Sequence, residues 1–295
     1  MYPVFRGVWR SLVARLVWDQ EAAGSNPAAP IRARSSTGQS AGFLTQGLEV
    51  RVLPGALLVL CLAEAGAAQA PAPRAANPER PTVATHAYAV APGFAELEQG
   101  VAIRGVRSFD EATSWDLNLK VGLAPGWQLG VSGTAYARTP DATGVGDIGL
   151  ALKGRTDVSR TVAVAVVPSM TVPTGSAGLS AGRTLGAVVG VLSAEVAPGW
   201  HADVNIGPTG IGAAAPQWFG SAGSTWSRGR GGLTVEVFGF TAGGVGPVQS
   251  GALVALLITP AEWVVVDAGG VWGMSLATPD QLFLGLTTNL GRIFK

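Results

Sequence analysis

Few side chains in this sequence could act as a nucleophile, a base or a metal ligand. The chain contains two histidines, His86 and His201, and one cysteine, Cys61. His201 stands two residues before Asp203, a spacing that places both on one face of a β-strand, where a carboxylate could orient an imidazole base. No serine in a recognisable nucleophile setting accompanies them, and no metal-ligand spacing is present. We expect no enzyme activity, metal site or cofactor.

Many other polar side chains occur at every second position of apolar segments, as Asp116, Asn118 and Lys120 do. Facing acidic and basic groups inside a pore can set a transverse field and tune selectivity, or they can pair across the lumen and plug it. Both interpretations stay open. The side chains that we expect to line a lumen are Glu96, Glu98, Arg104, Asp116, Asn118, Lys120, Asp147, Lys153, Arg155, Glu195, His201, Asp203, Asn205, Glu236, Asp267 and Asn289.

The composition indicates a membrane protein without spanning helices. Of the 295 residues 47% are hydrophobic and 13% are charged, and the formal net charge is +1. Soluble domains carry about 25% charged residues, and a balanced charge provides no basic surface for nucleic acid. Beyond residue 70 no apolar run approaches the roughly 18 residues that a spanning helix needs. Transmembrane β-strands are the remaining class.

Apolar and polar residues alternate with period two from residue 93 to the C-terminus, the pattern of strands with one polar face. We expect an all-β fold, an antiparallel up-and-down transmembrane barrel of about twelve strands, with ten or fourteen as alternatives. A soluble β-sandwich would alternate as well. The expected strands are residues 94–106, 113–123, 127–138, 145–155, 161–173, 185–196, 200–207, 217–227, 232–241, 247–258, 263–274 and 280–294.

Turn lengths and tryptophans agree with a barrel of this kind. Short turns are expected at 124–126, 157–159, 197–199, 228–230 and 259–261, and the intervening connections are mostly longer, as in outer-membrane barrels with periplasmic short turns. A sandwich would scatter its tryptophans through a core. Here they lie at predicted strand ends, as two aromatic girdles require, although Trp263 is one position off the apolar alternation: Trp115, Trp127, Trp200, Trp218, Trp226, Trp263 and Trp272.

The first 92 residues divide into three segments. Residues 24–27 (Gly-Ser-Asn-Pro) and 50–53 (Val-Arg-Val-Leu) resemble translations of a transfer RNA gene in two frames, so we interpret residues 1–53 as a misassigned upstream translation. Residues 54–70 have the apolar core and the Ala68-Gln69-Ala70 site of a signal peptide cleaved after Ala70. Residues 71–92 are rich in alanine and proline without periodicity, and we expect an extended periplasmic leader before a barrel of residues 93–295.

Short motifs in the barrel region resemble known families. The C-terminal residues 290–295 are similar to the strand that delivers bacterial barrels to their assembly machinery, with Phe294 as the aromatic signal and Lys295 beyond it. Residues 96–100 (Glu-Leu-Glu-Gln-Gly), 146–153 (Gly-Asp-Ile-Gly-Leu-Ala-Leu-Lys) and 172–175 (Val-Pro-Thr-Gly) resemble the outer-membrane transporter family named for the MetA pathway of phenol degradation. That resemblance covers residues 93–295 and implies a pore for small compounds, aromatic ones included.

The sequence therefore predicts an outer-membrane pore or passive transporter for small molecules. Its expected partners are outer-membrane lipids, the barrel-assembly machinery and an unidentified solute. A non-conducting structural barrel is one alternative. An outer-membrane lipid hydrolase built on a serine and His201 is another, since some twelve-stranded barrels have that activity. Eight strands are filled by their own side chains and sixteen enclose a channel, so twelve make a narrow pore feasible.

Overall fold

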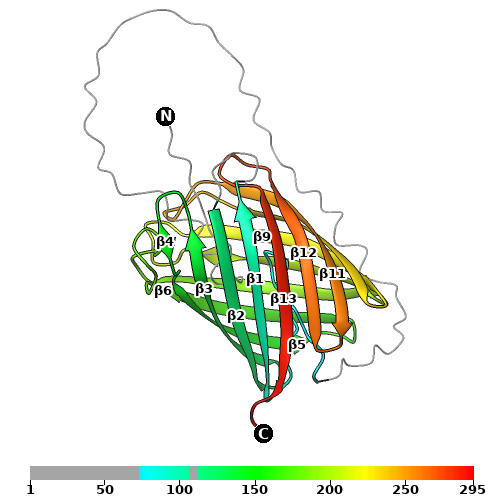
Figure 1. The fold of residues 1–295 in the computed structure, drawn as a ribbon. Helices are drawn as coiled ribbons and strands as arrows, with labels where there is room; N and C mark the ends of the chain where they lie inside the picture. Colours follow the sequence, from blue (N-terminus) through cyan, green and yellow to red (C-terminus); the bar gives the residue numbers. More distant parts are fainter. Residues whose placement is uncertain (1–72, 106–111) are drawn as a thin grey trace, which may run out of the picture. The chain divides into compact units, whose positions relative to one another are not determined.

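The computed structural model describes residues 73–105 and 112–295. Twelve strands in these residues form a closed antiparallel barrel, as predicted, and one short extra strand, β4, pairs with the end of β3 (Figure 1). No helix among the described residues is long and apolar enough to cross a membrane. The strands are β1 (Phe94–Arg104), β2 (Ala112–Ala124), β3 (Trp127–Arg138), β4 (Thr143–Gly144), β5 (Ile148–Asp157), β6 (Val162–Val172), β7 (Leu185–Ala197), β8 (Trp200–Thr209), β9 (Gln217–Arg228), β10 (Gly231–Phe240), β11 (Gln249–Ala261), β12 (Val264–Gly273) and β13 (Gln281–Arg292).

Each barrel strand pairs with its neighbours in the sequence, β3 pairing with β5, and the barrel closes between the first and last strands. In that closing pair Arg104 lies opposite Gln281 and Phe94 opposite Arg292. Closure leaves no open sheet edge, which is the condition for β-structure within a lipid bilayer.

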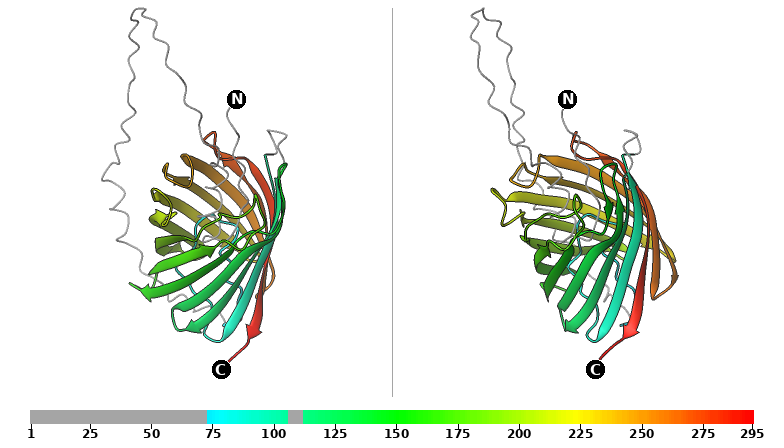
Figure 2. Two further views of the ribbon diagram at one scale, coloured as in Figure 1. Left: turned by 90° about the vertical axis from the view of Figure 1, so that its left-hand side faces the viewer. Right: turned by 60° about the vertical axis from the view of Figure 1, so that its left-hand side comes forward.

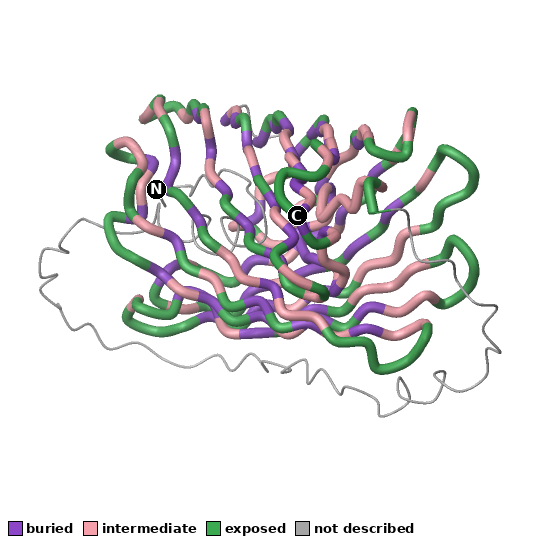
Figure 3. Tube along the Cα trace, turned by 90° about the horizontal axis from the view of Figure 1, so that it is seen from below, coloured by how far each residue is buried: buried purple, intermediate pink, exposed green. Residues whose placement is uncertain are grey.

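The period-two pattern produces two chemically different faces of the wall. Along β2, Leu119 and Leu123 are exposed, whereas Asn118 and Lys120 are buried inside the barrel. Figure 3 shows the same alternation of buried and exposed residues along the other strands. The outer face is therefore apolar and lipid-compatible, and the inner face carries the polar side chains.

The short connections lie at one end of the barrel and mostly match their predicted places. Gly126, Gly199 and Gly229 have positive φ angles of 77°, 73° and 61° in three of these turns, a conformation that favours glycine. The turn predicted at 259–261 is wrong. Those residues end β11, and the chain reverses at Glu262 and Trp263, because a bulge between Ile258 and Ala261 adds one residue to β11.

The seven tryptophans of the barrel lie within three residues of a strand end, with side chains 42–61% exposed. Trp263 lies in the β11–β12 turn rather than in a strand. Phe294 follows the end of β13, where its backbone N–H donates to the Gly93 carbonyl at 3.3 Å.

The N-terminal part of the described chain lies inside the barrel. We call residues 73–93 the plug segment; it is cyan in Figures 1 and 2 and is seen between the barrel walls. The expected extended periplasmic leader at 71–92 is not what the structure shows for residues 73–92, because their polar groups bind the inner wall of the barrel. The predicted upstream translation (1–53) and signal peptide (54–70) lie outside the described residues.

Candidate functional site: the occupied lumen

Side chains of the barrel wall accept hydrogen bonds from backbone N–H groups of the plug segment. Glu236 on β10 accepts from Val83 at 2.6 Å and from Ala84 at 2.9 Å. Glu98 on β1 accepts from the N–H of Glu79 at 2.6 Å. The wall thus supplies the acceptors that buried backbone N–H groups require. Further pairs, wall residue first, are Glu96–Asn77 at 2.7 Å, Asn205–Thr85 at 3.2 Å, Ser193–Ala87 at 2.7 Å and Gln128–Val90 at 2.9 Å.

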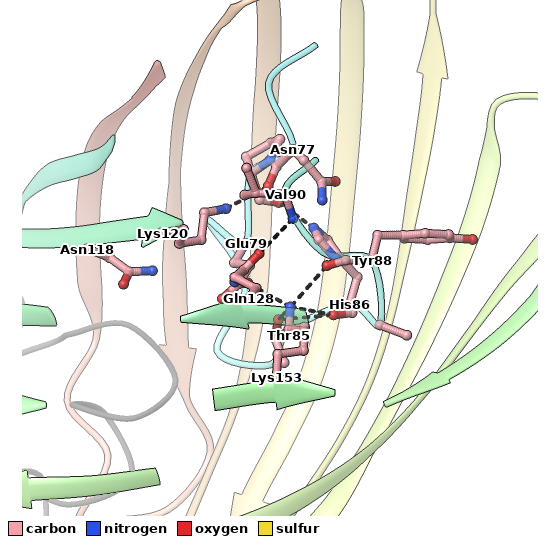
Figure 4. A network of polar contacts seen from close by, with 12 residues as sticks. Asn77, Glu79, Thr85, His86, Tyr88, Val90, Asn118, Lys120, Gln128 and Lys153 are labelled. Carbon is pink, nitrogen blue, oxygen red and sulfur yellow. Dashed lines mark hydrogen bonds and ion pairs between the residues drawn. The ribbon is translucent and has the colours of Figure 1, made fainter. Parts of the chain in front are cut away.

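Two buried lysines of the wall bind the plug segment from β2 and β5 (Figure 4). The Lys153 ammonium lies 2.6 Å from a carboxylate oxygen of Glu79 and also donates to the carbonyls of His86 and Tyr88 at 2.8 and 3.2 Å. Lys120 pairs with two wall carboxylates and donates to a plug carbonyl at 2.7 Å. Removing one partner of a buried charge is strongly destabilising, so these contacts help to keep the plug segment in the barrel.

Inward glycines make room for the plug segment. The Arg80 guanidinium pairs with Asp267 on β12 at 3.3 Å. A Cβ atom added to Gly100 or to Gly285, which face each other on β1 and β13, would fall 2.4 Å from the Arg80 side chain. A Cβ added to Gly122 would lie 2.2 Å from the Ala91 carbonyl oxygen. The smallest wall residues therefore lie where the plug approaches most closely.

Burial shifts the acid–base behaviour of the plug segment. Burial, assisted by the positive charge of Lys153, lowers the pKa of His86 to about 3, so its imidazole is neutral at pH 7. Burial alone would raise the pKa of Glu79, but Lys153 and Lys120 outweigh it and hold that pKa well below its usual range. Burial also raises the pKa of Tyr88. The plug therefore carries an ionised Glu79 beside a neutral His86.

His201 and Asp203 lie at the short-turn end of β8 with a serine beside them. The imidazole Nε2 of His201 and the hydroxyl of Ser193 both contact the same oxygen of Asp203, at 3.0 and 2.5 Å. Ser193 is thus bonded to the carboxylate, and its oxygen accepts from the Ala87 N–H. A serine hydrolase needs the base bonded to the nucleophile, and this arrangement does not supply that contact.

The remaining predicted lumen residues, apart from Asp147, fall into two groups. Towards the long-loop end, Arg104 donates to Gln281 at 3.1 Å, and Asp116 accepts from Thr134 at 2.5 Å. At the short-turn end, Arg155 pairs with Asp157 and lies 4.7 Å from the centre of the Tyr88 ring, Glu195 is half-buried opposite His201, and Asn289 donates to the Ala75 carbonyl at 3.2 Å.

Asp147 differs from the other predicted lumen residues. It precedes β5, and its two carboxylate oxygens accept from the N–H groups of Gly175 and Ala181, both at 2.7 Å. Its carboxylate therefore anchors the β6–β7 connection.

Sequence analysis assigned no role to the plug residues Glu79, Arg80 and Tyr88 or to the wall residues Gln128 and Ser193. A segment without periodicity carries no strand signal. The one usable sign was the number of inward glycines, which leave space beside the wall charges.

Two cavities lie beside the plug segment. A cavity of about 320 Å³ lies at the short-turn end, where Arg80, His86 and Tyr88 face Leu257 and Val265 of the wall. A second cavity, of about 20 Å³, lies between Glu79 and the wall and has room for about one water. The described residues contain no group of three His, Cys, Asp or Glu side chains placed to hold a metal ion.

Comparisons with known proteins show what this fold resembles. No protein-family model and no curated protein matches the chain. Among solved structures, the chain is similar to the COG4313 outer membrane channel from Pseudomonas putida F1, with 13% identity, 69% of this chain and 98% of that chain covered, and a TM-score of 0.54. It is also similar to the NanC porin, with 9% identity, 66% of this chain and 100% of that chain covered, and a TM-score of 0.52. The KdgM porin matches with 10% identity, 65% of this chain and 98% of that chain covered, and a TM-score of 0.50. The fold of this chain is that of outer-membrane channel and porin barrels.

Proposed function

We propose that this chain is a passive outer-membrane channel for small molecules, held closed by its plug segment. The observation that supports this most directly is the way the lumen is filled. A twelve-stranded wall has more interior than its own side chains fill, and here a separate stretch of chain occupies the space. It is held by hydrogen bonds, ion pairs and packing contacts. Water and solute can replace such contacts when the segment moves.

In this proposal the charged side chains of the wall bind the plug segment in the closed state and contact the solute in the open state. Withdrawal of residues 73–93 would expose Glu98, Lys120, Lys153, Glu236 and Asp267, which come from five strands. Acidic and basic groups both occur in this ring, so we expect weak selectivity between anions and cations. We propose solutes that are small, with apolar and aromatic ones included, as the MetA-family resemblance implies.

The same proposal includes the route to the membrane. We propose export with a signal peptide cleaved after Ala70, delivery by the barrel-assembly machinery through the C-terminal strand with Phe294, and outer-membrane lipids as the surroundings of the apolar outer face. Peptide mass spectrometry of outer-membrane fractions tests this. A mature chain that begins at residue 71 is the expected result, whereas recovery in the cytoplasm would contradict it.

The channel function is tested by conductance of the full-chain protein in planar bilayers. We expect rare, discrete openings for the wild type. Glu236→Ala removes the acceptor of two plug N–H groups, at a cost of about 1–3 kcal/mol for each group left unsatisfied, and openings should become frequent. Val235→Ala is the matched control, since Val235 is the neighbouring residue and points outward, 44% exposed.

Silence of both the wild type and Glu236→Ala would overturn the channel. Folding is checked by heat-modifiable gel mobility, so that a silent but folded protein is identified as a non-conducting structural barrel.

A further inference from the structure

The cavity of about 320 Å³ at the short-turn end lies between the plug segment and the barrel wall. Plug residues between Ala76 and Tyr88 form one side of it, and residues of β8 to β12 form the other. Its lining includes Gly229 and Gly231 at the β9–β10 turn, and both are exposed. Short turns of outer-membrane barrels face the periplasm, so a ligand would reach the cavity from that side.

One ring nitrogen of His86, a residue that lines the cavity, lacks a hydrogen-bond partner. The other nitrogen, Nε2, lies 3.2 Å from the carbonyl oxygen of Pro78, which can only accept, so Nε2 carries the proton. Burial lowers the pKa of His86 to about 3, so its Nδ1 is an acceptor at pH 7. This buried Nδ1 has no partner within the described part of the chain. A ligand with an N–H or O–H group would supply the missing donor.

Aromatic rings and hydroxyl groups form much of the remaining lining. The centre of the Tyr88 ring lies 5.7 Å from that of His86, its neighbour on the plug segment in Figure 4, and 5.3 Å from that of His201 on β8. On the wall, the hydroxyls of Thr225 and Thr234 lie 2.8 Å apart. Flat rings pack well against aromatic side chains. A volume of about 320 Å³ is near the lower end of the range for small-molecule sites, which favours a compact ligand.

The charged side chains of the lining already have partners. Arg80 pairs with Asp267 at 3.3 Å. Asp203 accepts from the Ser193 hydroxyl at 2.5 Å and contacts His201 at 3.0 Å. A charged ligand would therefore bring an uncompensated charge into a partly enclosed site, which is unfavourable. The cavity favours a neutral molecule.

We infer that this cavity binds a neutral one-ring molecule with an N–H or O–H donor, and that the bound molecule keeps the channel closed. The inference rests on the proposed channel function and adds its regulation. Because one side of the cavity belongs to the plug segment, the site is complete only while the plug is in the barrel. A ligand that binds one of two states shifts the population towards that state. A molecule of this class that accumulates in the periplasm would thereby reduce further flux.

Nicotinamide, a neutral one-ring amide, is the probe, and N,N-dimethylnicotinamide, which lacks N–H donors, is its matched control. The full-chain protein is reconstituted in phospholipid vesicles, and hydrogen exchange of the Val83 and Ala84 amides reports plug release, since both are bonded to Glu236. At about ten times the concentration for half-maximal binding, nicotinamide should slow their exchange about tenfold. The dimethyl compound should slow it much less, and equal slowing would refute the need for a donor.

Leu257→Trp fills the cavity from β11, so the effect of nicotinamide should be lost. Leu256→Trp is the matched control, because Leu256 is the neighbouring residue and points outward, 62% exposed. His86→Phe, which keeps a ring and removes the acceptor, is the second variant and should weaken the effect if Leu257→Trp does not fold.

Three outcomes would overturn the inference. Unchanged exchange of the wild type in nicotinamide, or equal slowing in Leu257→Trp and Leu256→Trp, would exclude this cavity as the site. Faster exchange would show that the ligand displaces the plug segment, which contradicts a closing role. Because hydrogen exchange needs no ion flow, these outcomes are distinct from a silent bilayer, which would contradict the channel itself.

Discussion

Removal of the Lys153 ammonium is the sharpest perturbation of the plug segment. In Lys153→Met, the Glu79 carboxylate loses the partner that lies 2.6 Å away, and the carbonyls of His86 and Tyr88 lose their donor. Leaving one member of a buried ion pair alone costs about 3–5 kcal/mol. Since about 1.4 kcal/mol is a factor of ten, the population with the plug released should rise by roughly a hundredfold to several thousandfold.

Hydrogen exchange measures that population directly. The N–H groups of Glu79, Val83 and Ala84 are bonded to wall carboxylates, so they exchange when the plug leaves. In Lys153→Met we expect these amides to exchange roughly a hundredfold to several thousandfold faster, while amides in the middle of the strands keep their wild-type rates. Equal acceleration in the strands would mean that the barrel itself has been destabilised.

The double variant separates the ion pair from the other contacts of Lys153. Adding Glu79→Gln to Lys153→Met removes the uncompensated charge, so plug protection should largely recover. Unchanged exchange in Lys153→Met, or a double variant as unprotected as the single one, would refute the assignment of Glu79 and Lys153 as a latch.

Three further results are expected. Acidification from pH 7 to 5 should increase conductance. When the plug segment is released, His86 gains a proton near its ordinary pKa of 6.5, whereas in the bound plug its pKa is about 3, so the stability of plug binding is lost as the pH falls through this window. A His86→Gln channel with the same pH response would contradict this. Gly285→Val should displace Arg80, whose side chain lies 2.4 Å from the added Cβ, and should raise conductance in a barrel with unchanged heat-modifiable mobility. Asp147→Ala should lower the free energy that protects each of the two bound loop amides from hydrogen exchange by about 1–3 kcal/mol, so both amides should exchange faster. Exchange at wild-type rates would exclude the role of Asp147 as an anchor.

The strands were predictable because the alternation is imposed by two different surroundings, lipid outside and polar groups inside. Along β2 and β13 most outward positions are apolar, as Leu117 and Leu119 are on β2 and Leu282 is on β13, so the pattern alone sets both the strand and its orientation. The turn after β11 was misplaced because Pro260, which usually marks a turn, lies in the bulged end of the strand.

The plug segment could not be predicted from its own residues. Four of its N–H groups bind side chains more than a hundred residues away, as Val83 binds Glu236, and such contacts impose no local period. Asp147 was assigned to the lumen by alternation alone, yet it stands outside β5, where alternation carries no information about direction. The sequence indicated which charged side chains face the interior of the barrel, but it did not indicate which group each of them contacts.

The path of the plug segment has a topological consequence. Its two ends lie at the same end of the barrel: the Ala76 N–H donates to the Glu262 carbonyl in the β11–β12 turn, and the Gly93 N–H donates to the Gly122 carbonyl near the β2–β3 turn. Between them the chain reaches Glu236 and Asn205 near the middle of their strands and returns. The segment is thus inserted as a loop, so it can slide out and back without threading a chain end through the wall or breaking one strand pair.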